Sequence, residues 1–524
     1  SLHDIHQLVE EPLVYLCQFM NLIYGMGRYL DSGDGSDISY ENANDHIQGS
    51  SVGMADGPFY PTSYKYKNEK RSQFVRGNFD LLGRYVVSAS LRRDGTDKFF
   101  PSKKYALFPS VSLAWKMNEE SFIKNISWIN MLKLRASYGE TGSDNLGTTL
   151  YGIVTTTRED VQFNNNSVTY IPYILSGANY EDVTWQKTVM KNIGLDFSIF
   201  RDRIWGSVDV FRNDVTHLLG TAPTELLGMH GTRPINGGHY KRTGIDVSLN
   251  SLNLQTHDFK WTSQITMPHY NAVWIERMPN YDYQKYQKRK NEPMNAFYYY
   301  KTTGIIDMDK SNMPESQRSL GPAACMPGYP IVEDKNGDGI IDVNDSYMDN
   351  MLPKLYFGFG NTFTWKNFDL DIFMYGQLGV KKWNDAYSYS ADAGNLSRGV
   401  DAHNVGIYSY NIWNTQTNTN GYFPGIAISK SVALPENLGF DYTRENASYI
   451  RVRNITLGYN LGPKELSVFK GYIRGIRVFV DFQNPLTFTK YKGYDPEINT
   501  SSSNLTGGQY PQMRVYSIGA KLTF

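Results

Sequence analysis

The sequence lacks any apolar run long enough for a transmembrane helix, although the chain has 524 residues. A helix that crosses a bilayer needs about 20 apolar residues. The best candidate, residues 13–26, is shorter and is interrupted by Gln18 and Asn21. The residues before this run are acidic rather than basic, which is the wrong charge for a secretory signal peptide. The sequence therefore predicts neither a membrane helix nor a leader.

Cysteine, net charge and catalytic motifs are also scarce. The two cysteines, Cys17 and Cys325, lie far apart, so neither a metal site nor a disulfide framework is expected. The 52 basic and 52 acidic residues cancel, which argues against nucleic acid as a partner. The nine histidines lack metal-ligand spacing, and no glycine-rich phosphate loop follows a strand. We therefore expect no enzyme, although carboxylate pairs leave glycosidase chemistry open.

Alternation of apolar and polar residues with a period of two is abundant, and it predicts strands with one apolar face. The last strand is an example, with Tyr516, Ile518, Ala520, Leu522 and Phe524 on one face. We predict about thirteen strands in all, at 72–82, 83–93, 104–117, 131–139, 188–200, 203–213, 240–252, 258–269, 354–366, 368–380, 447–460, 473–484 and 512–524. The phase of the alternation slips near Asn454, which indicates a β-bulge.

The links between these strands alternate in length, with the short ones at 82–83, 201–202, 253–257 and 367. Short turns at one rim and long loops at the other are typical of an outer-membrane barrel, and not of a sandwich or propeller. We therefore predict an antiparallel transmembrane β-barrel with loops 214–239, 270–353 and 381–446 on the same side. Aromatic residues make up 14% of the chain. Those near strand ends fit interfacial girdles, although core packing stays an alternative: Trp115, Trp205, Trp261 and Trp365.

Residues 1–70 show no such pattern, so we expect an irregular, unassigned segment there and the barrel portion over residues 71–524. An odd number of strands would put the two ends of the sheet at opposite rims, whereas single-chain bacterial barrels have an even number. Two open edges would also leave backbone groups that lipid cannot satisfy. We therefore expect a partial barrel that is not a competent transporter alone, with its other strands supplied upstream or by another chain.

Five stretches carry a family resemblance: YVVSASLRRDG at 85–95, FPSVSLAW at 108–115, LKLRASYG at 132–139, SYIRVRNITLGY at 448–459 and QNPLTFTKYKGYDPE at 483–497. In this order they resemble the SusC/RagA family of TonB-dependent transporters. The resemblance implies a barrel of about 22 strands around an N-terminal plug, in contact with outer-membrane lipids. It also implies a SusD-like surface lipoprotein as partner, coupling to TonB through an N-terminal region, and import of oligosaccharides or oligopeptides. The alternatives are a soluble all-β carbohydrate-binding or glycoside-hydrolase domain and a purely structural barrel.

One acidic stretch has the spacing of a calcium-binding loop. Its candidate ligands are the side chains of Asp334, Asn336, Asp338, Asp342 and Asp345 and the backbone carbonyl of Ile340. Hard oxygen donors suit Ca²⁺, which would stiffen an external loop. Against this, the last position is Asp where a bidentate Glu is usual, and no helices flank the loop. An acidic glycine turn without an ion is the alternative.

Two further groups are candidate binding residues. Aromatic side chains in the long loops can stack on sugar rings or contact a capping lipoprotein, or they can pack within the loops. They are Tyr298, Tyr299, Tyr300, Trp383, Tyr387 and Trp413. Arg451 and Arg453 are predicted to face inward, where they line the lumen or pair with carboxylates of a plug.

Overall fold

The computed structural model describes most of the chain. The described residues are 17–40, 59–146, 162–163, 166–167, 181–223, 232–279, 283–288, 291–383, 411–425, 434–441, 444–462, 465–469, 472–493, 495–498 and 511–524. Among them, no helix combines the length and the apolar character that crossing a membrane requires.

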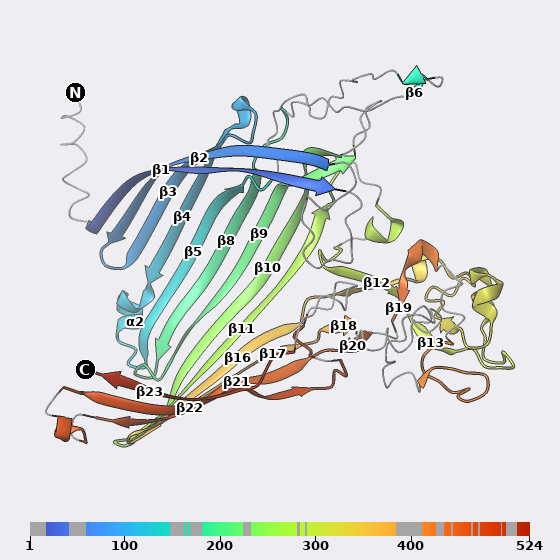
Figure 1. Cartoon of the computed structure of the whole chain (residues 1–524). Coiled ribbons are helices and arrows are strands. Elements are labelled where there is room, and N and C mark those ends of the chain that lie inside the picture. The colour runs from blue at the N-terminus through green and yellow to red at the C-terminus, as the bar shows by residue number, and fades with distance from the viewer. Residues whose placement is uncertain are drawn as a thin grey trace.

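One antiparallel sheet of 14 strands organises the molecule, and its strands follow one another in chain order (Figure 1). They are β1 (Cys17–Tyr40), β2 (Phe59–Leu81), β3 (Tyr85–Thr96), β4 (Tyr105–Lys116), β5 (Ile129–Ser143), β8 (Gln186–Ile199), β9 (Ile204–Pro223), β10 (Thr232–Gln255), β11 (Phe259–Glu276), β16 (Leu355–Trp365), β17 (Phe368–Leu378), β21 (Tyr449–Leu461), β22 (Gly475–Thr489) and β23 (Val515–Thr523). All thirteen predicted strands are confirmed, and the all-β class with them.

The prediction of an irregular segment over residues 1–70 is wrong where the structure describes it. Residues 17–40 form β1, which pairs with β2 along almost its whole length, and β2 begins at Phe59. The first half of β1 alternates in hydropathy, but glycines and polar residues interrupt the second half, so the pattern fades. Pairing with β2 supplies the backbone hydrogen bonds that the side-chain pattern does not reveal. Residues 1–16 and 41–58 lie outside the described part.

The extra strand also corrects the parity argument. Cys17 at the start of β1 lies opposite Leu81, beside the short turn that joins β2 to β3. The C-terminal end of β23 lies at the same rim (Figure 1). With 14 strands, both ends of the sheet are therefore on one side, as in bacterial barrels.

The two rims differ as the link lengths predicted. Because every consecutive pair is antiparallel, the strand ends that flank the links 224–231, 277–354 and 379–448 all lie at one rim. The short turns at 82–84, 200–203, 256–258 and 366–367 lie at the other. The turn at 200–203 is tight enough that Phe200, Arg201 and Asp202 all have positive φ, between 57° and 60°. The link between β9 and β10 is shorter than predicted because both strands extend toward it.

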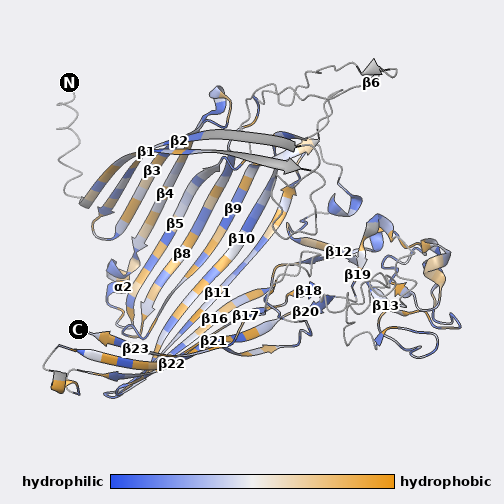
Figure 2. Ribbon diagram, in the orientation of Figure 1, coloured by the Kyte–Doolittle hydropathy of each residue, from blue (hydrophilic) through white to orange (hydrophobic). Residues whose placement is uncertain are grey.

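The two faces of the sheet also differ, as the alternating colours along the strands show (Figure 2). On the apolar face many large side chains are exposed, among them Leu22, Leu113, Ile193, Val210 and Ile518. Such a wide exposed apolar band is what lipid covers in a membrane barrel. The predicted bulge is confirmed, because the pairing of β21 with both neighbours shifts between Val452 and Asn454.

The sheet is open in the part of the chain that the structure describes. In those residues β1 pairs only with β2, and β23 pairs only with β22. The predicted terminal strand therefore does not close onto residues 72–82, which lie inside the sheet between β1 and β3.

Smaller elements occupy the links. The short strands are β6 (Gln162–Phe163), β7 (Asn166–Ser167), β12 (Ala296–Tyr300), β13 (Thr302–Ile305), β14 (Pro330–Val332), β15 (Tyr347–Asn350), β18 (Lys381–Trp383), β19 (Gly439–Phe440) and β20 (Arg444–Asn446). The helix α2 (Ser121–Lys124) lies at the short-turn rim. Short 3₁₀ helices lie at 101–103, 117–119, 285–288, 315–320, 322–325, 343–345, 435–437 and 467–469. Cys325 is a free thiol.

Candidate functional site

The polar face of the sheet is lined in its middle by small side chains. Serines on β3, β4 and β5 stand side by side across the strands: Ser88, Ser90, Ser110, Ser112 and Ser137. Asn192 and Asn213 continue the row on β8 and β9. These residues line a hollow of about 720 Å³. Phe211 and Tyr270 also line this hollow, so its wall is mixed, and its hydroxyl and amide groups can hydrogen-bond a polar solute.

Toward the short-turn rim, the polar face carries ion pairs between strands. Arg135 on β5 donates to both oxygens of Asp196 on β8, at 2.9 and 2.7 Å, and to Asp209 on β9 at 3.0 Å. Lys116 on β4 lies 3.0 Å from Asp80 on β2. These contacts join β5 to its neighbour β8 and also bridge one intervening strand, from β5 to β9 and from β4 to β2, so this part of the wall is polar with its charges matched.

Beyond the long-loop rim, two links fold together into one external unit. β12 pairs antiparallel with β15 from its own link and parallel with β19 from the next link. Asp441 accepts hydrogen bonds from the backbone N–H and the hydroxyl of Thr302, at 2.9 and 2.7 Å. Asp349 lies between Arg444 and Lys381, at 3.1 and 3.0 Å. The unit lies past the ends of β11, β16 and β17 (Figure 1).

The aromatic candidates occupy the interior of this unit. Tyr298, Tyr299 and Tyr300 are all buried, and Tyr300 packs with Val332, Ile341 and Leu434. Burial, followed by the nearby carboxylate of Asp349, raises the pKa of Tyr299 to about 12. These positions favour packing within the loops over contact with cargo.

The other aromatic candidates are placed only in part. Trp413 is buried, and Trp383 ends β18 with its backbone opposite Arg444. Tyr387 lies outside the described residues. The structure therefore brings the tyrosines of 298–300 together but does not join them to the other candidates in one binding surface.

The acidic loop at 334–345 forms a hydrogen-bonded turn. Asp334 accepts from the backbone N–H groups of Gly337 and Gly339, at 2.7 and 2.8 Å. Asp345 is fully buried and accepts from Lys335, Asn336 and Asp342 backbone N–H groups.

The other candidate ligands of this turn make similar local bonds. Asn336 and Asp338 each accept a backbone N–H two residues further on, and so does Asp342. The backbone N–H of Ile340 is thereby engaged with Asp338. In the described part of the chain, no three acidic, histidine or cysteine side chains are placed to hold a metal ion. The carboxylates and the Asn336 amide oxygen of this turn thus accept hydrogen bonds from backbone N–H groups.

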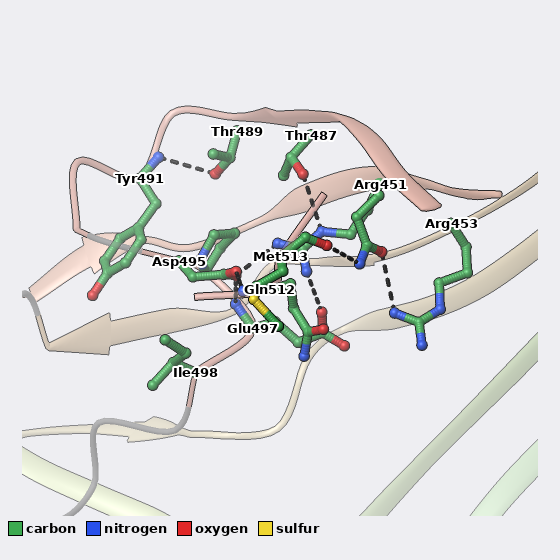
Figure 3. A network of polar contacts seen from close by, with 12 residues as sticks. Arg451, Arg453, Thr487, Thr489, Tyr491, Asp495, Glu497, Ile498, Gln512 and Met513 are labelled. Atoms are coloured by element: carbon green, nitrogen blue, oxygen red, sulfur yellow. Dashed lines mark hydrogen bonds and ion pairs between the residues drawn. The ribbon is translucent and has the colours of Figure 1, made fainter. Parts of the chain in front are cut away.

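A buried charge cluster lies at the long-loop end of β21 (Figure 3). Arg451 is 2% exposed and donates to Asp495 at 2.7 Å and to Glu497 at 2.6 Å. Its Nε donates to Thr487 on β22 at 3.0 Å. Tyr375 on β17 donates its hydroxyl to both oxygens of Glu497, at 2.8 and 2.7 Å. Side chains of β17 and β21 thereby hold the link that follows β22, and Thr487 of β22 holds Arg451 in place.

The carboxylate of Asp495 is held ionised in this cluster. Burial by itself raises its pKa, but the backbone N–H groups of Glu497 and Gln512 and the charge of Arg451 outweigh burial. The pKa of Asp495 therefore lies below its ordinary value of 3.8. The sequence left Arg451 either lining the lumen or pairing with carboxylates of a plug, and the carboxylates that it meets here belong to this chain. Asp495 and Glu497 were missed, although both lie in the quoted stretch 483–497.

The family model for the β-barrel of TonB dependent receptor-like proteins matches residues 16–484. The chain belongs to this family. TonB-dependent receptor barrels lie in the outer membrane, so the predicted location is confirmed and a soluble carbohydrate-binding or hydrolase domain is excluded. Members are transporters rather than enzymes, in agreement with the sequence-based expectation.

Curated relatives narrow the family to the SusC type. The chain is 28% identical over 519 residues to TonB-dependent receptor P3 of Formosa agariphila, which covers 93% of this chain and 48% of that protein. It is 27% identical over 484 residues to TonB-dependent receptor SusC of Bacteroides thetaiotaomicron, with 88% and 44% covered. The resemblance drawn from five short stretches is therefore confirmed. The chain spans about half the length of the curated relatives it matches.

The barrel also matches a solved structure, the RagAB peptide transporter. The TM-score is 0.73 at 22% identity, over 97% of this chain and 54% of the matched one. This likeness supports the fold, in which 14 consecutive strands of a TonB-dependent receptor barrel form an open sheet.

Proposed function

We propose that this barrel imports nutrients across the outer membrane in a TonB-dependent manner. The observation that carries the proposal is the combination of a polar, serine-lined wall with a folded unit of two loops at its long-loop rim. A wall of that kind suits a path for polar solutes, and an ordered external unit suits capture of cargo before entry. A purely structural barrel has no need for either feature.

The cargo class is proposed to be oligosaccharides or oligopeptides. One relative is named SusC, and one structural neighbour is named a peptide transporter. By analogy, a SusD-like surface lipoprotein would dock on the external unit, and TonB would act through an N-terminal region of the working protein. A plug and the strands that pair with β1 and β23 would come from the same source.

The test is uptake and co-purification with the protein in its own outer membrane. We expect a tagged protein to retain a SusD-like lipoprotein in detergent, and labelled oligosaccharide or oligopeptide uptake to stop when TonB is deleted. Uptake that persists without TonB would contradict energy coupling. If deletion of the barrel gene left the uptake of both oligosaccharides and oligopeptides unchanged, the transport proposal would be contradicted.

Calcium binding by residues 334–345 is a separate proposal with a structural role. The support for it is the spacing of six oxygen donors along the chain. Binding would require Asp334, Asp338 and Asp342 to turn from backbone N–H groups toward one centre. The ion would then rigidify the external unit without taking part in chemistry.

A further inference from the structure

Three arginines lie together on the apolar face of the sheet, at the long-loop end of its first strands. Arg28 on β1 is directly opposite Arg71 on β2, and Arg93 on β3 lies opposite Gln73. With Tyr105 of β4 they line a hollow of about 470 Å³. The side chains of Arg28 and Arg71 are 64% and 54% exposed. Basic side chains are therefore grouped where apolar ones prevail elsewhere on the same face.

The group carries more positive than negative charge. Glu69 accepts hydrogen bonds from both Arg28 and Arg71, at 2.8 and 2.5 Å. Arg93 has no carboxylate partner among the residues that the structure describes, and its guanidinium lies 4.1 Å from the centre of the Tyr105 ring. Arg28 and Arg71 thus share one carboxylate, and Arg93 adds a third positive charge without a carboxylate partner among the described residues. The hollow is suited to an anion.

The aromatic wall of the hollow depends on a glycine. The ring of Tyr105 lies against the bare backbone of Gly95, where a Cβ would come within 2.3 Å of a ring carbon. This close approach seats the ring beneath Arg93.

The level of the group in the membrane follows from β1. On its apolar face Met20, Leu22, Tyr24 and Met26 are between 61% and 71% exposed, and Arg28 comes next. The eight residue-to-residue steps from Met20 to Arg28 span about 27 Å along the strand. With the usual tilt this is about 20 Å of depth, close to the apolar band of about 25 Å in such barrels. The arginines therefore lie at the boundary of that band on the long-loop, external side.

We propose that this arginine hollow binds the phosphate groups of the phosphorylated glycolipid in the outer leaflet of the outer membrane. Planar guanidinium groups recognise phosphate through paired hydrogen bonds. The acyl chains of the same lipid would lie along the apolar side chains of β1 and its neighbours. The proposal rests on the membrane location and is independent of the cargo.

The test uses protein extracted from outer membranes, stripped of lipid, and titrated in detergent with bisphosphorylated lipid A while native mass spectrometry counts bound lipid. Dephosphorylated lipid A and inorganic phosphate are the matched probes. We expect the wild type to prefer the phosphorylated lipid. Removal of one interfacial arginine should weaken the affinity for the phosphorylated lipid about fivefold. We expect this decrease in affinity for Arg93→Gln, a change that leaves the ion pairs of Glu69 with Arg28 and Arg71 intact.

The control is Arg212→Gln, which removes an exposed arginine from the same face. Arg212 already pairs with Asp214 at 2.8 Å, so its loss should leave lipid affinity unchanged. Equal affinity for the two lipids, or an unchanged affinity in Arg93→Gln, would overturn the proposal. So would tighter binding of inorganic phosphate than of lipid. An acidic surface protein that is released by Arg93→Gln while lipid stays bound would also overturn it.

Discussion

At the scale of single residues, Arg451 determines where the link after β22 lies. Its guanidinium makes three hydrogen bonds, two of them to carboxylates of that link, and it is almost inaccessible to water. A buried charge is tolerated only while its partners are present, because their attraction offsets the free energy of removing the charge from water. Loss of any one charged partner should therefore disrupt the whole contact between the barrel wall and this external link.

Arg451→Met tests this contact. The change leaves the carboxylate of Asp495 buried without its cation, at a cost of about 3–5 kcal/mol. We expect a lower unfolding temperature of the extracted protein. We also expect faster chemical modification of the side chain of Tyr491, which is buried within this link. Arg453→Gln is the matched control, because Arg453 is exposed at the bulge and bonds only to Asn484 in the contacts recorded for it. A similar effect of both changes would refute the role given to Arg451.

Acid should loosen the same cluster. Because the folded pKa of Asp495 is lowered, its contribution to stability is present above pH 3.8 and declines as pH falls further, through the lowered pKa. We expect Tyr491 modification to stay slow at pH 5 and to accelerate only once the pH falls below 3.8. Asp495→Asn should abolish this acid-dependent step. A rate that stays flat down to pH 3 in the wild type would contradict the assignment.

The calcium proposal is also decided by single side chains. If the loop binds Ca²⁺, isothermal titration should show heat at millimolar or lower concentration, and Asp338→Ala should remove it. Asp309→Ala is a fitting control, because Asp309 lies in the same link but bonds only locally to Ser311 in the contacts recorded. Titration of the wild type without heat would dismiss the calcium site.

At the scale of elements, each strand presents one face to lipid and one to the lumen. Val111 and Ser112 on β4 are adjacent in sequence, so their side chains point to opposite faces of the sheet. Val111 is exposed on the apolar face, whereas Ser112 pairs with Ser88 and Ser137 in the row of serines on the polar face. A one-residue shift of register would exchange them, so neighbouring positions report the orientation of the whole strand.

We therefore expect opposite outcomes from adjacent lysines. Val111→Lys places a charge in lipid and should cost about 2–4 kcal/mol near the midplane, whereas Ser112→Lys should cost less than about 0.5 kcal/mol. The measurement is the folded fraction in outer membranes, read from heat-modifiable migration on gels. Equal folded fractions of the two variants would contradict the assigned faces.

At the scale of the whole molecule, the two longest described links act as one body because Asp441 joins them. Asp441→Ala removes both hydrogen bonds to Thr302 and should separate β19 from β12 at a cost of about 1–3 kcal/mol. We expect the barrel to reach the outer membrane normally but to retain less of its proposed lipoprotein partner. Glu315→Ala, an exposed position in the same unit, is the control. If Asp441→Ala retained as much lipoprotein as the wild type, the contact between Asp441 and Thr302 would not be needed for partner binding.

The class, the strand positions and the two rims could be predicted from the sequence alone. Alternation of side chains and the lengths of links are local properties, so they survive without knowledge of the fold. That is why all thirteen predicted strands and the bulge before Asn454 reappear. The five quoted stretches identified the family for the same reason.

Contacts between residues that are distant in sequence could not be predicted in this way, because they depend on the three-dimensional fold. β1 was recognised through its pairing with β2, because half of it lacks a side-chain pattern. Tyr298, Tyr299 and Tyr300 were candidates for cargo contact until burial placed them inside the external unit. Arg451 meets Asp495, which lies 44 positions away, and Arg28 meets Glu69 across a link of the chain. Such contacts depend on strand register and loop folding, which bring together side chains that no local pattern connects.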